Sequence, residues 1–154
     1  MLESIINKTN NLYKKNNIAV IHKKDVDVNF SKVIKQNGKL KVENAYIKKK
    51  SFADYYGVFK SKFIAFEAKS TELNSLPLDN IKIHQHNYLK LIRDNGGICF
   101  YIFYYKKFNS FFYIDWEVIE EYKGKSLNIE EAKKLGSELE LIYPGIIDYI
   151  QFCE

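Results

Sequence analysis

Two carboxylates and a lysine near the middle of the chain have the residue types and spacing of a metal-dependent hydrolytic site. Glu67 and Lys69 stand two residues apart in an apolar run with strand composition, so their side chains share one face. Asp54 opens a neighbouring run, and a β-hairpin would return its carboxylate to Glu67. Carboxylates hold hard cations such as Mg²⁺, and an ammonium stabilises charge developing on phosphate. The pattern predicts phosphodiester hydrolysis; the alternative is a hairpin with ordinary surface charges.

The hairpin is predicted from two short runs that are rich in aromatic and β-branched residues. The runs are Tyr55–Phe59 and Phe63–Phe66, and Lys60-Ser61-Lys62 between them has turn composition. Phe66 and Ala68 alternate with the charged residues and are expected to face the opposite side of the sheet. The elements that position the candidate site are therefore two adjacent β-strands.

Length and composition indicate one globular domain over residues 1–154. Of the 154 residues, 46% are hydrophobic and 28% are charged, which is typical of globular proteins. The N-terminus lacks the apolar core of a signal peptide, and no stretch of the sequence approaches the length of a membrane span, so we expect a cytoplasmic protein. Cys99 and Cys153 have the spacing of neither a disulfide framework nor a zinc site.

Positive charge is concentrated in one segment. The chain has 24 Lys and Arg residues against 19 Asp and Glu residues, a net charge of +5. Residues 22–50 contain nine lysines and three acids, a net of +6, whereas residues 115–154 contain four lysines and ten acids, a net of −6. The basic segment has strand character and a hairpin-turn signal at Asn37-Gly38, but few large apolar residues. We predict a protruding basic β-arm, inserted at about residues 23–50, that binds a polyanion; a solvated charged face is the alternative.

Helical and strand patterns follow one another along the rest of the chain. The expected elements are a helix from about Leu2 to Lys15, a strand at Ile18–Ile21, a loop at Ser70–Asn80, a helix at Ile81–Arg93, strands at Ile98–Tyr105 and Ser110–Asp115, and helices at Trp116–Tyr122 and Asn128–Gly136. Ile98–Tyr105 is almost continuously apolar, which predicts a strand buried on both faces. Asn128 is expected to be an N-cap. This order predicts an α/β fold with a mixed β-sheet flanked by helices, as in the restriction-endonuclease-like core.

A series of short motifs occurs in the same order as in one known family. The motifs are Leu2-Glu3 with Ile6-Asn7, residues 17–24, Ala45-Tyr46, residues 54–57, residues 66–69, Pro77-Leu78, His84-Gln85 and residues 97–100. Asp54 with Glu67-Ala68-Lys69 resembles the signature of the PD-(D/E)-x-K nuclease superfamily. The whole series, from Leu2 to about Tyr149, resembles the RecU-type Holliday-junction resolvases, whose protruding stalk the basic arm matches.

The resemblance implies an endonuclease of DNA recombination and repair that resolves four-way DNA junctions. It further implies a homodimer that uses Mg²⁺, for which Mn²⁺ substitutes, and that cuts two opposing strands symmetrically. Asp54 and Glu67 match the acidic metal ligands of the family, Lys69 matches its transition-state stabiliser, and Gln85 matches a glutamine at its metal site. Recombinases and branch-migration proteins are further candidate partners.

Phosphate contacts are expected from lysines, because Arg93 is the single arginine in the sequence. The candidate DNA-binding residues are Lys23, Lys24, Lys32, Lys35, Lys39, Lys41, Lys48, Lys49 and Lys50. Glu3 is a candidate accessory acid near the metal, and the alternative is that it complements the helix dipole. His84 is expected to be structural or to contact a phosphate, and His86 to lie on the surface, since Mg²⁺ prefers oxygen ligands.

One position departs from the family pattern. Members tend to carry a small hydroxyl residue two positions before the acidic ligand, where this chain has Phe52; Ser51 is adjacent but would face the other way in a strand. Any ligand from Phe52 must therefore be its backbone carbonyl or a water held there. Two other functions stay open: a related nuclease that acts on linear duplex DNA, and a non-catalytic DNA-binding accessory module of recombination.

Overall fold

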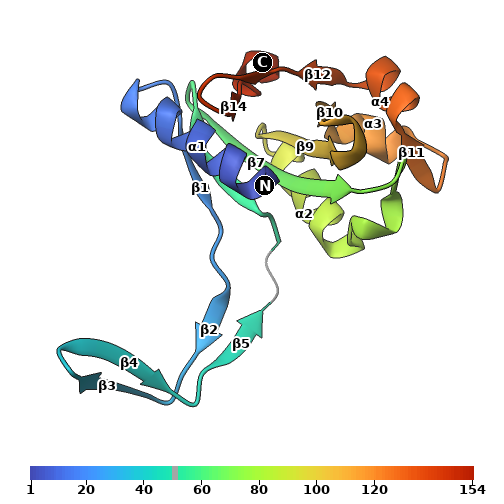
Figure 1. The fold of residues 1–154 in the computed structure, drawn as a ribbon. Helices are drawn as coiled ribbons and strands as arrows, with labels where there is room; N and C mark the ends of the chain where they lie inside the picture. The colour runs from blue at the N-terminus through green and yellow to red at the C-terminus, as the bar shows by residue number, and fades with distance from the viewer. Residues whose placement is uncertain (50–51) are drawn as a thin grey trace.

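The computed structural model describes residues 1–49 and 52–154 as a mixed α/β fold from which a β-arm projects (Figure 1). A six-stranded sheet forms the centre, in the order β1-β6-β7-β9-β10-β12. Neighbouring strands run antiparallel except β7 and β9, which run parallel. The strands are β1 (Val20–Lys23), β6 (Tyr55–Phe59), β7 (Lys62–Thr71), β9 (Ile98–Tyr105), β10 (Ser110–Asp115) and β12 (Ser137–Leu139). The predicted α/β class with a mixed sheet is confirmed.

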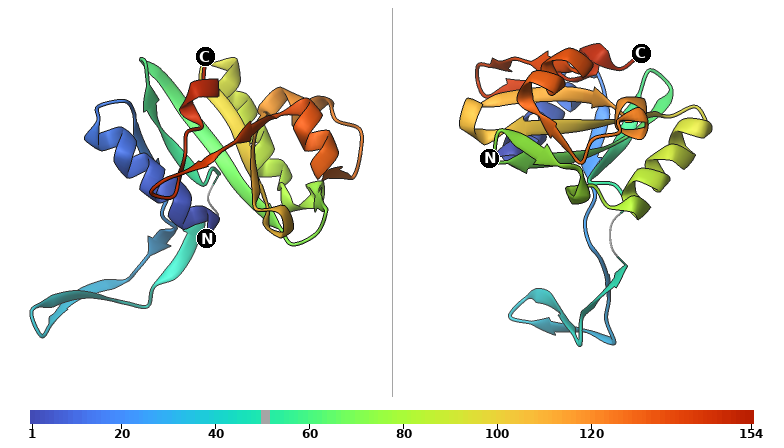
Figure 2. Two further views of the ribbon diagram at one scale, coloured as in Figure 1. Left: turned by 45° about the horizontal axis from the view of Figure 1, so that its top comes forward. Right: turned by 90° about the vertical axis from the view of Figure 1, so that its right-hand side faces the viewer.

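Helices cover both faces of this sheet (Figures 1 and 2). One face packs against α1 (Leu2–Lys15), η3 (Ile150–Phe152) and β14 (Ile146–Ile147), which pairs with the exposed strand β13 (Leu141–Ile142). The other face packs against α2 (Ile83–Asp94), α3 (Trp116–Glu121) and α4 (Ile129–Leu135). Alternation along the strands divides the core, so that Phe66 and Phe100 stack at 4.6 Å between ring centroids on the α1 side, while Tyr101 packs on the α2 side. In the described part of the chain, no helix is long and apolar enough to cross a membrane.

The central strand β9 and the helix before it follow from the sequence as predicted. Every residue of β9 from Cys99 to Tyr105 is buried, and a strand covered on both faces has no polar alternation. A parallel pair needs a crossover connection, and α2 lies in the connection between β7 and β9. Gly96, at φ +88°, turns the chain back after α2, and Gly97 packs so closely that a Cβ would lie 2.4 Å from the Ile92 side chain.

The basic segment forms the predicted arm. Strands β2 (Asp27–Asn29) and β5 (Tyr46–Lys49) pair nearer the sheet, and β3 (Lys32–Gln36) and β4 (Lys39–Glu43) pair at the tip. Asn37 (φ 52°) and Gly38 (φ 75°) form the tip turn, and positive φ at both central residues is what a tight hairpin turn needs. Figure 2 shows from two further sides that the arm extends away from the sheet. None of residues 22–47 is buried, so the arm has no core of its own.

Two expectations about elements are wrong. The predicted loop at Ser70–Asn80 is largely ordered structure, because β7 continues to Thr71 and further elements follow. Within the predicted loop these elements are β8 (Ser75–Pro77), which pairs with β11 (Ser126–Asn128), and the short helix η1 (Leu78–Asn80). A second short helix, η2 (Lys106–Phe108), lies outside this segment and joins β9 to β10. The partner of β8 lies far along the chain, so no local pattern indicates the pairing. The first strand begins at Val20 instead of Ile18, because Asn17 has a left-handed backbone (φ 53°) after α1.

Local signals in the second half of the chain are confirmed. Asn128 caps α4, and its side chain and that of Glu131 form a reciprocal capping box with the backbone. The strand at Ser110–Asp115 has the predicted bounds. Cys99 and Cys153 are both buried and free, as expected from their spacing. These features depend on neighbours in the sequence, which is why the sequence predicts them.

Candidate active site

The β6–β7 hairpin brings Asp54 and Glu67 side by side, as the sequence predicts. Tyr55 of β6 pairs with Phe66 of β7, so Asp54, one residue before β6, lies opposite Glu67. The Asp54 carboxylate accepts a hydrogen bond through Oδ2 from the backbone N–H of Ala68 at 3.1 Å. Its backbone carbonyl accepts another from the backbone N–H of Lys24 at 2.7 Å. Asp54 is therefore held between β7 and the segment after β1 where the chain enters the arm, which we call the first root of the arm.

Glu67 is a carboxyl group in the interior of the protein, with 0% of its side chain exposed. Burial and then the charge of Asp54 raise the pKa of the Glu67 carboxyl to about 8, while the nearby Lys69 ammonium acts to lower this pKa. The Nζ atom of Lys69 lies 3.0 Å from Oε2 of Glu67. The Asp54 charge raises the pKa of Glu67, so an additional cation between the two carboxyls would favour the ionised form of Glu67.

Three buried oxygens of the candidate metal ligands lack hydrogen-bond partners among the described residues. They are the two carboxylate oxygens of Glu67, apart from the ion pair with Lys69, and the amide oxygen of Gln85 in the first turn of α2. Gln85 is 8% exposed, and leaving its oxygen unpaired carries a cost. Carboxylate and amide oxygens are ligands that hard divalent cations prefer. The donor set of Asp54, Glu67 and Gln85 therefore fits Mg²⁺ or Mn²⁺.

The candidate donor set is not made of acids alone. Within residues 1–49 and 52–154, no group of three or more His, Cys, Asp and Glu side chains is arranged to hold a metal ion. The candidate set has two carboxylates, Asp54 and Glu67, and takes its third oxygen from Gln85. An amide oxygen is also a ligand of hard cations, so two carboxylates and one amide can hold the ion.

Glu3 lines a cavity of about 330 Å³ next to the candidate site. Its carboxylate pairs with the Lys23 ammonium at 2.6 Å, and both residues line this cavity together with Asp54. Glu3 also stands in the first turn of α1, where an acid complements the helix dipole. The structure is therefore compatible with both roles that the sequence leaves open for Glu3.

The expectation that His86 lies on the surface is wrong. Its Nδ1 atom lies 2.6 Å from the Tyr101 hydroxyl and its Nε2 atom lies 2.6 Å from a carboxylate oxygen of Glu120. The ring stacks on Trp116 at 4.7 Å, and the Trp116 indole N–H donates to the backbone carbonyl of His86 at 3.0 Å. These partners come from β9 and α3, so no local spacing predicts them. The contacts anchor the turn of α2 that carries Gln85.

The position that departs from the family pattern has a packing role. The Phe52 ring stacks on Tyr88 of α2 at 5.1 Å and lies edge-on to the ring of His84 at 6.1 Å. His84 is otherwise exposed, in agreement with a structural or phosphate-contacting role. Ser51 lies outside the described residues. A backbone or water ligand from Phe52 stays a prediction.

The candidate DNA-binding lysines are spread along the arm and its roots. Lys32, Lys35, Lys39 and Lys41 are exposed on β3 and β4, the strands of the arm that lie farthest from the central sheet (Figure 1). Lys23 and Lys24 stand at the first root, and Lys48 and Lys49 belong to β5. Lys50 lies outside the described residues. The described lysines therefore lie at the tip of the arm, on its strand β5, and where the chain passes from β1 into the arm.

Comparison with known proteins shows the family. The model of the family described as RecU, Recombination protein U, matches residues 1–154. The chain belongs to this family. A protein of Mycoplasmopsis pulmonis named Holliday junction resolvase RecU is 37% identical over 99% of this chain and 91% of its own length. A Bacillus subtilis protein of the same name is 35% identical over 99% of this chain and 78% of its own length.

Among solved structures, the Archaeoglobus fulgidus protein Hjc, described as a Holliday junction resolvase, matches more distantly. The TM-score is 0.42 at 13% identity, over 55% of this chain and 67% of that one. The family assignment depends on the RecU family model and on the RecU-named relatives, and the resemblance seen in the sequence is confirmed by them.

Proposed function

We propose that this RecU family member is a metal-dependent endonuclease that resolves four-way (Holliday) DNA junctions. The observation that carries the proposal is the buried Glu67 carboxylate next to Asp54, whose oxygens, like the Gln85 amide oxygen, lack hydrogen-bond partners in the described structure. A hairpin with ordinary surface charges has no reason to bury a carboxylate, because burying an ionisable group is costly. The names of the relatives from M. pulmonis and B. subtilis support the choice of substrate.

In this proposal a divalent cation, Mg²⁺ or its substitute Mn²⁺, is held by the carboxylates of Asp54 and Glu67 and the amide oxygen of Gln85. When bound, such a cation polarises a phosphate and lowers the pKa of water. Lys69, with 19% of its side chain exposed, is placed to offset negative charge on a phosphate oxygen at the site. No serine, cysteine or histidine nucleophile is needed for this chemistry.

The arm is proposed to be the part that recognises the junction. A resolvase acts on many sequences, so shape must contribute more than contacts to base edges. The arm presents lysines at its tip and extends beyond the sheet, so it can enter the centre of a four-way junction. Lys23 and Lys24 would then bind the phosphates of one DNA duplex of the junction near Asp54.

We further propose that the chain is one nuclease domain with the arm as its stalk, and that it acts as a homodimer. Two opposing strands cut symmetrically need two sites related by a twofold axis, which is the commonest symmetry of protein dimers. Light scattering at micromolar concentration should therefore report a dimer. A monomer that still makes paired nicks in a junction would contradict this proposal.

The function is tested by cleavage of matched DNA substrates. Four-way, three-way and linear DNAs of equal length and overlapping sequence are incubated with the protein in Mg²⁺, in Mn²⁺ and in a chelator. We expect paired nicks near the branch point of the four-way DNA with either metal, and no cleavage with the chelator. Equal cleavage of linear DNA would assign a duplex nuclease, and junction binding without cleavage in any metal would assign a non-catalytic accessory module.

A further inference from the structure

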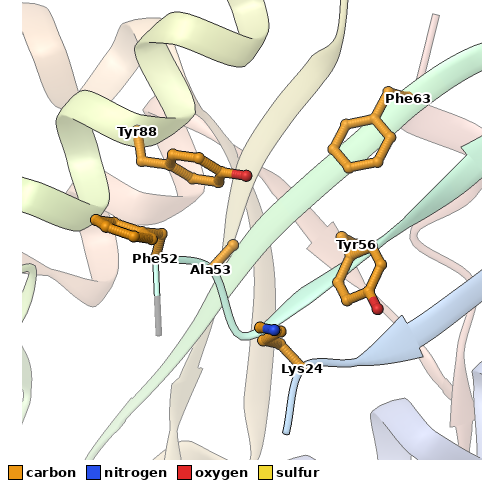
Figure 3. Close-up of a pocket in the computed structure, with 6 residues that line it drawn as sticks. All are labelled: Lys24, Phe52, Ala53, Tyr56, Phe63 and Tyr88. Atoms are coloured by element: carbon orange, nitrogen blue, oxygen red, sulfur yellow. The ribbon is translucent and has the colours of Figure 1, made fainter. Parts of the chain in front are cut away.

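An aromatic pocket opens next to the candidate active site, and its aromatic rings have no part in the function proposed so far. The pocket holds about 350 Å³, a size typical of ligand sites. It lies between α2 and the β6–β7 hairpin, and its lining residues are Lys24, Phe52, Ala53, Tyr56, Phe63 and Tyr88 (Figure 3).

The four aromatic rings are arranged as two stacked pairs. Phe52 and Tyr88 stack at 5.1 Å with 28° between their planes, and Tyr56 and Phe63 stack at 6.2 Å with 27° between theirs. Figure 3 shows the two pairs on opposite sides of the pocket, with Ala53 between them and the Tyr88 hydroxyl pointing toward the second pair. A planar ring entering the pocket would therefore meet aromatic surfaces on both sides.

The second pair, Tyr56 and Phe63, is exposed in a six-stranded sheet that otherwise buries its aromatic residues. Tyr56 is 37% exposed and Phe63 is 41% exposed, whereas Phe66 and Tyr101 in the same sheet are fully buried. Two large rings that remain accessible on one face of the sheet are available to a ligand. Aromatic surfaces of this kind stack on nucleobases of any sequence, because every base has a π-face.

The pocket shares its supporting elements with the candidate metal site. Ala53 immediately precedes Asp54, and Tyr88 follows Gln85 by one helical turn on the same side of α2. Phe63 and Glu67 stand four residues apart in β7, so they point to the same face of the sheet. A DNA strand whose phosphate lies at the metal site would therefore have its neighbouring nucleotide beside the pocket.

Lys24 supplies the charge that such a nucleotide needs. Its ammonium group lies at the edge of the pocket, 3.1 Å from a carboxylate oxygen of Asp27. An ammonium next to aromatic rings is the combination found where proteins bind single-stranded nucleic acid.

We propose that this pocket binds an unpaired nucleobase of the substrate DNA, taken from the strand that lies at the Asp54–Glu67 site, with the phosphate of that nucleotide on Lys24. The inference rests on the proposed function. Bases at the branch point of a junction lose stacking neighbours, so they can leave the helix at lower cost than bases inside an arm. Stacking without base-edge contacts leaves the pocket indifferent to sequence, as a resolvase requires.

The test uses a four-way junction with 2-aminopurine at the branch point, bound to the full chain in a chelator so that no strand is cut. We expect the double variant Tyr56→Leu/Phe63→Leu, which keeps apolar volume but loses both ring faces, to bind the junction about 5- to 100-fold more weakly. The fluorescence change of 2-aminopurine on binding should disappear with it. Tyr56→Phe keeps the ring and should retain both signals.

Val58→Ala is the matched control, since Val58 is 51% exposed, pairs directly with Phe63 across the hairpin and does not line the pocket. It should bind like the wild type. Lys24→Ala should lower the slope of log affinity against log salt by about one unit. Thermal melting of each variant shows that it is folded; if the double variant melts early, Phe63→Leu alone is compared with Val58→Ala.

Three results would overturn the proposal. If the double variant binds and reports 2-aminopurine like the wild type, no base enters the pocket, although the chain can still be a resolvase. If the double variant loses dimerisation in light scattering while the monomer still changes 2-aminopurine fluorescence, the aromatic face joins two copies of the chain. If the wild type binds four-way and linear DNA equally, the proposed function fails as well.

Discussion

The candidate active site and the arm hold their charges in opposite surroundings. At the site, Glu67 is fully buried and Gln85 almost so, and burial shifts the pKa of Glu67 to about 8. On the arm, none of residues 22–47 is buried, so their charges stay in water and are screened by salt. Under the proposed function, one chain therefore separates two tasks: strong local electrostatics for chemistry, and weak, numerous, salt-dependent contacts for holding DNA.

The largest expected effect is that of substitutions in the candidate active site on the rate of cleavage. Asp54→Asn or Glu67→Gln should lower the single-turnover rate of junction cleavage by about 10²- to 10³-fold or more, because each change removes a charged oxygen that favours the cation. Junction affinity should stay within about threefold of wild type, since the lysines bind the phosphates. Glu138→Gln changes an exposed carboxylate of β12 and should cut normally. Cleavage near the wild-type rate by Glu67→Gln would remove Glu67 from the site.

Shortening the arm should have the next largest effect, and on binding. Deleting the tip around Asn37-Gly38 removes Lys32, Lys35, Lys39 and Lys41 from the DNA. The slope of log affinity against log salt should fall by about 0.9 for each lysine–phosphate pair that the deletion removes. Four-way DNA should lose more affinity than linear DNA, because only the junction has a centre for the arm to enter, and nicking of gapped DNA should survive.

Two other results of the deletion would contradict this division of tasks. Equal loss of affinity for four-way and linear DNA would make the arm a general electrostatic clamp. A protein that no longer folds without the tip would show that the arm belongs to the core, against the exposure of its residues.

A smaller effect is expected on stability, and it depends on pH. The pKa of Glu67 is raised from 4.5 to about 8 in the folded protein, so the neutral form favours folding. That contribution is fully present below pH 4.5 and is lost as the pH rises toward 8. In a chelator at pH 7, Glu67→Gln should therefore be more stable than the wild type by about 1–3 kcal/mol in urea unfolding.

The pH series contains its own control. The advantage of Glu67→Gln should vanish near pH 4, where wild-type Glu67 is neutral, and should shrink in Mg²⁺, which favours the ionised carboxylate. Glu138→Gln should show none of this dependence. A Glu67→Gln protein less stable than the wild type at pH 7 would mean that the pair with Lys69 outweighs the cost of burial.

The smallest effect is expected for substitution of a single lysine of the arm, measured as a change in the free energy of unfolding. Lys39→Ala should change the free energy of unfolding by less than about 0.5 kcal/mol, because surface substitutions without packed partners rarely do more. The same variant should still lower the salt slope of junction binding by about one unit. A loss of more than about 1 kcal/mol in thermal or urea unfolding would show that the arm lysine packs against the body.

How much the sequence predicts depends on how far away the deciding neighbours are. Asp54, Glu67 and Lys69 are brought together by strand periodicity and one hairpin, both of which are local, so their clustering is predicted. The pairing of β8 with β11 joins segments about fifty residues apart, so the sequence alone predicts a loop at β8. The partners of His86 lie on β9 and α3, so its burial has no local signal.

The aromatic pocket escapes a reading of the sequence for a related reason. Phe52, Tyr56 and Phe63 belong to the β6–β7 hairpin and its entry, Tyr88 comes from α2, and each looks like core material by itself. The available signal is in β6, where both faces carry large apolar residues: Tyr55 is buried, while Tyr56 points outward. Alternation that never becomes polar on its outer face indicates a face used for binding or assembly.

The hydrogen bond from the backbone N–H of Lys24 to the backbone carbonyl of Asp54 connects the start of the arm to the candidate active site. Lys24 is the residue with which the chain leaves β1 for the arm, and Asp54 is the residue with which it re-enters the hairpin. Under the proposed function, we expect DNA that restricts the orientation of the arm to restrict that of Asp54 as well. By reciprocity, a cation held by the Asp54 carboxylate is then expected to favour the orientation of the arm that binds the junction.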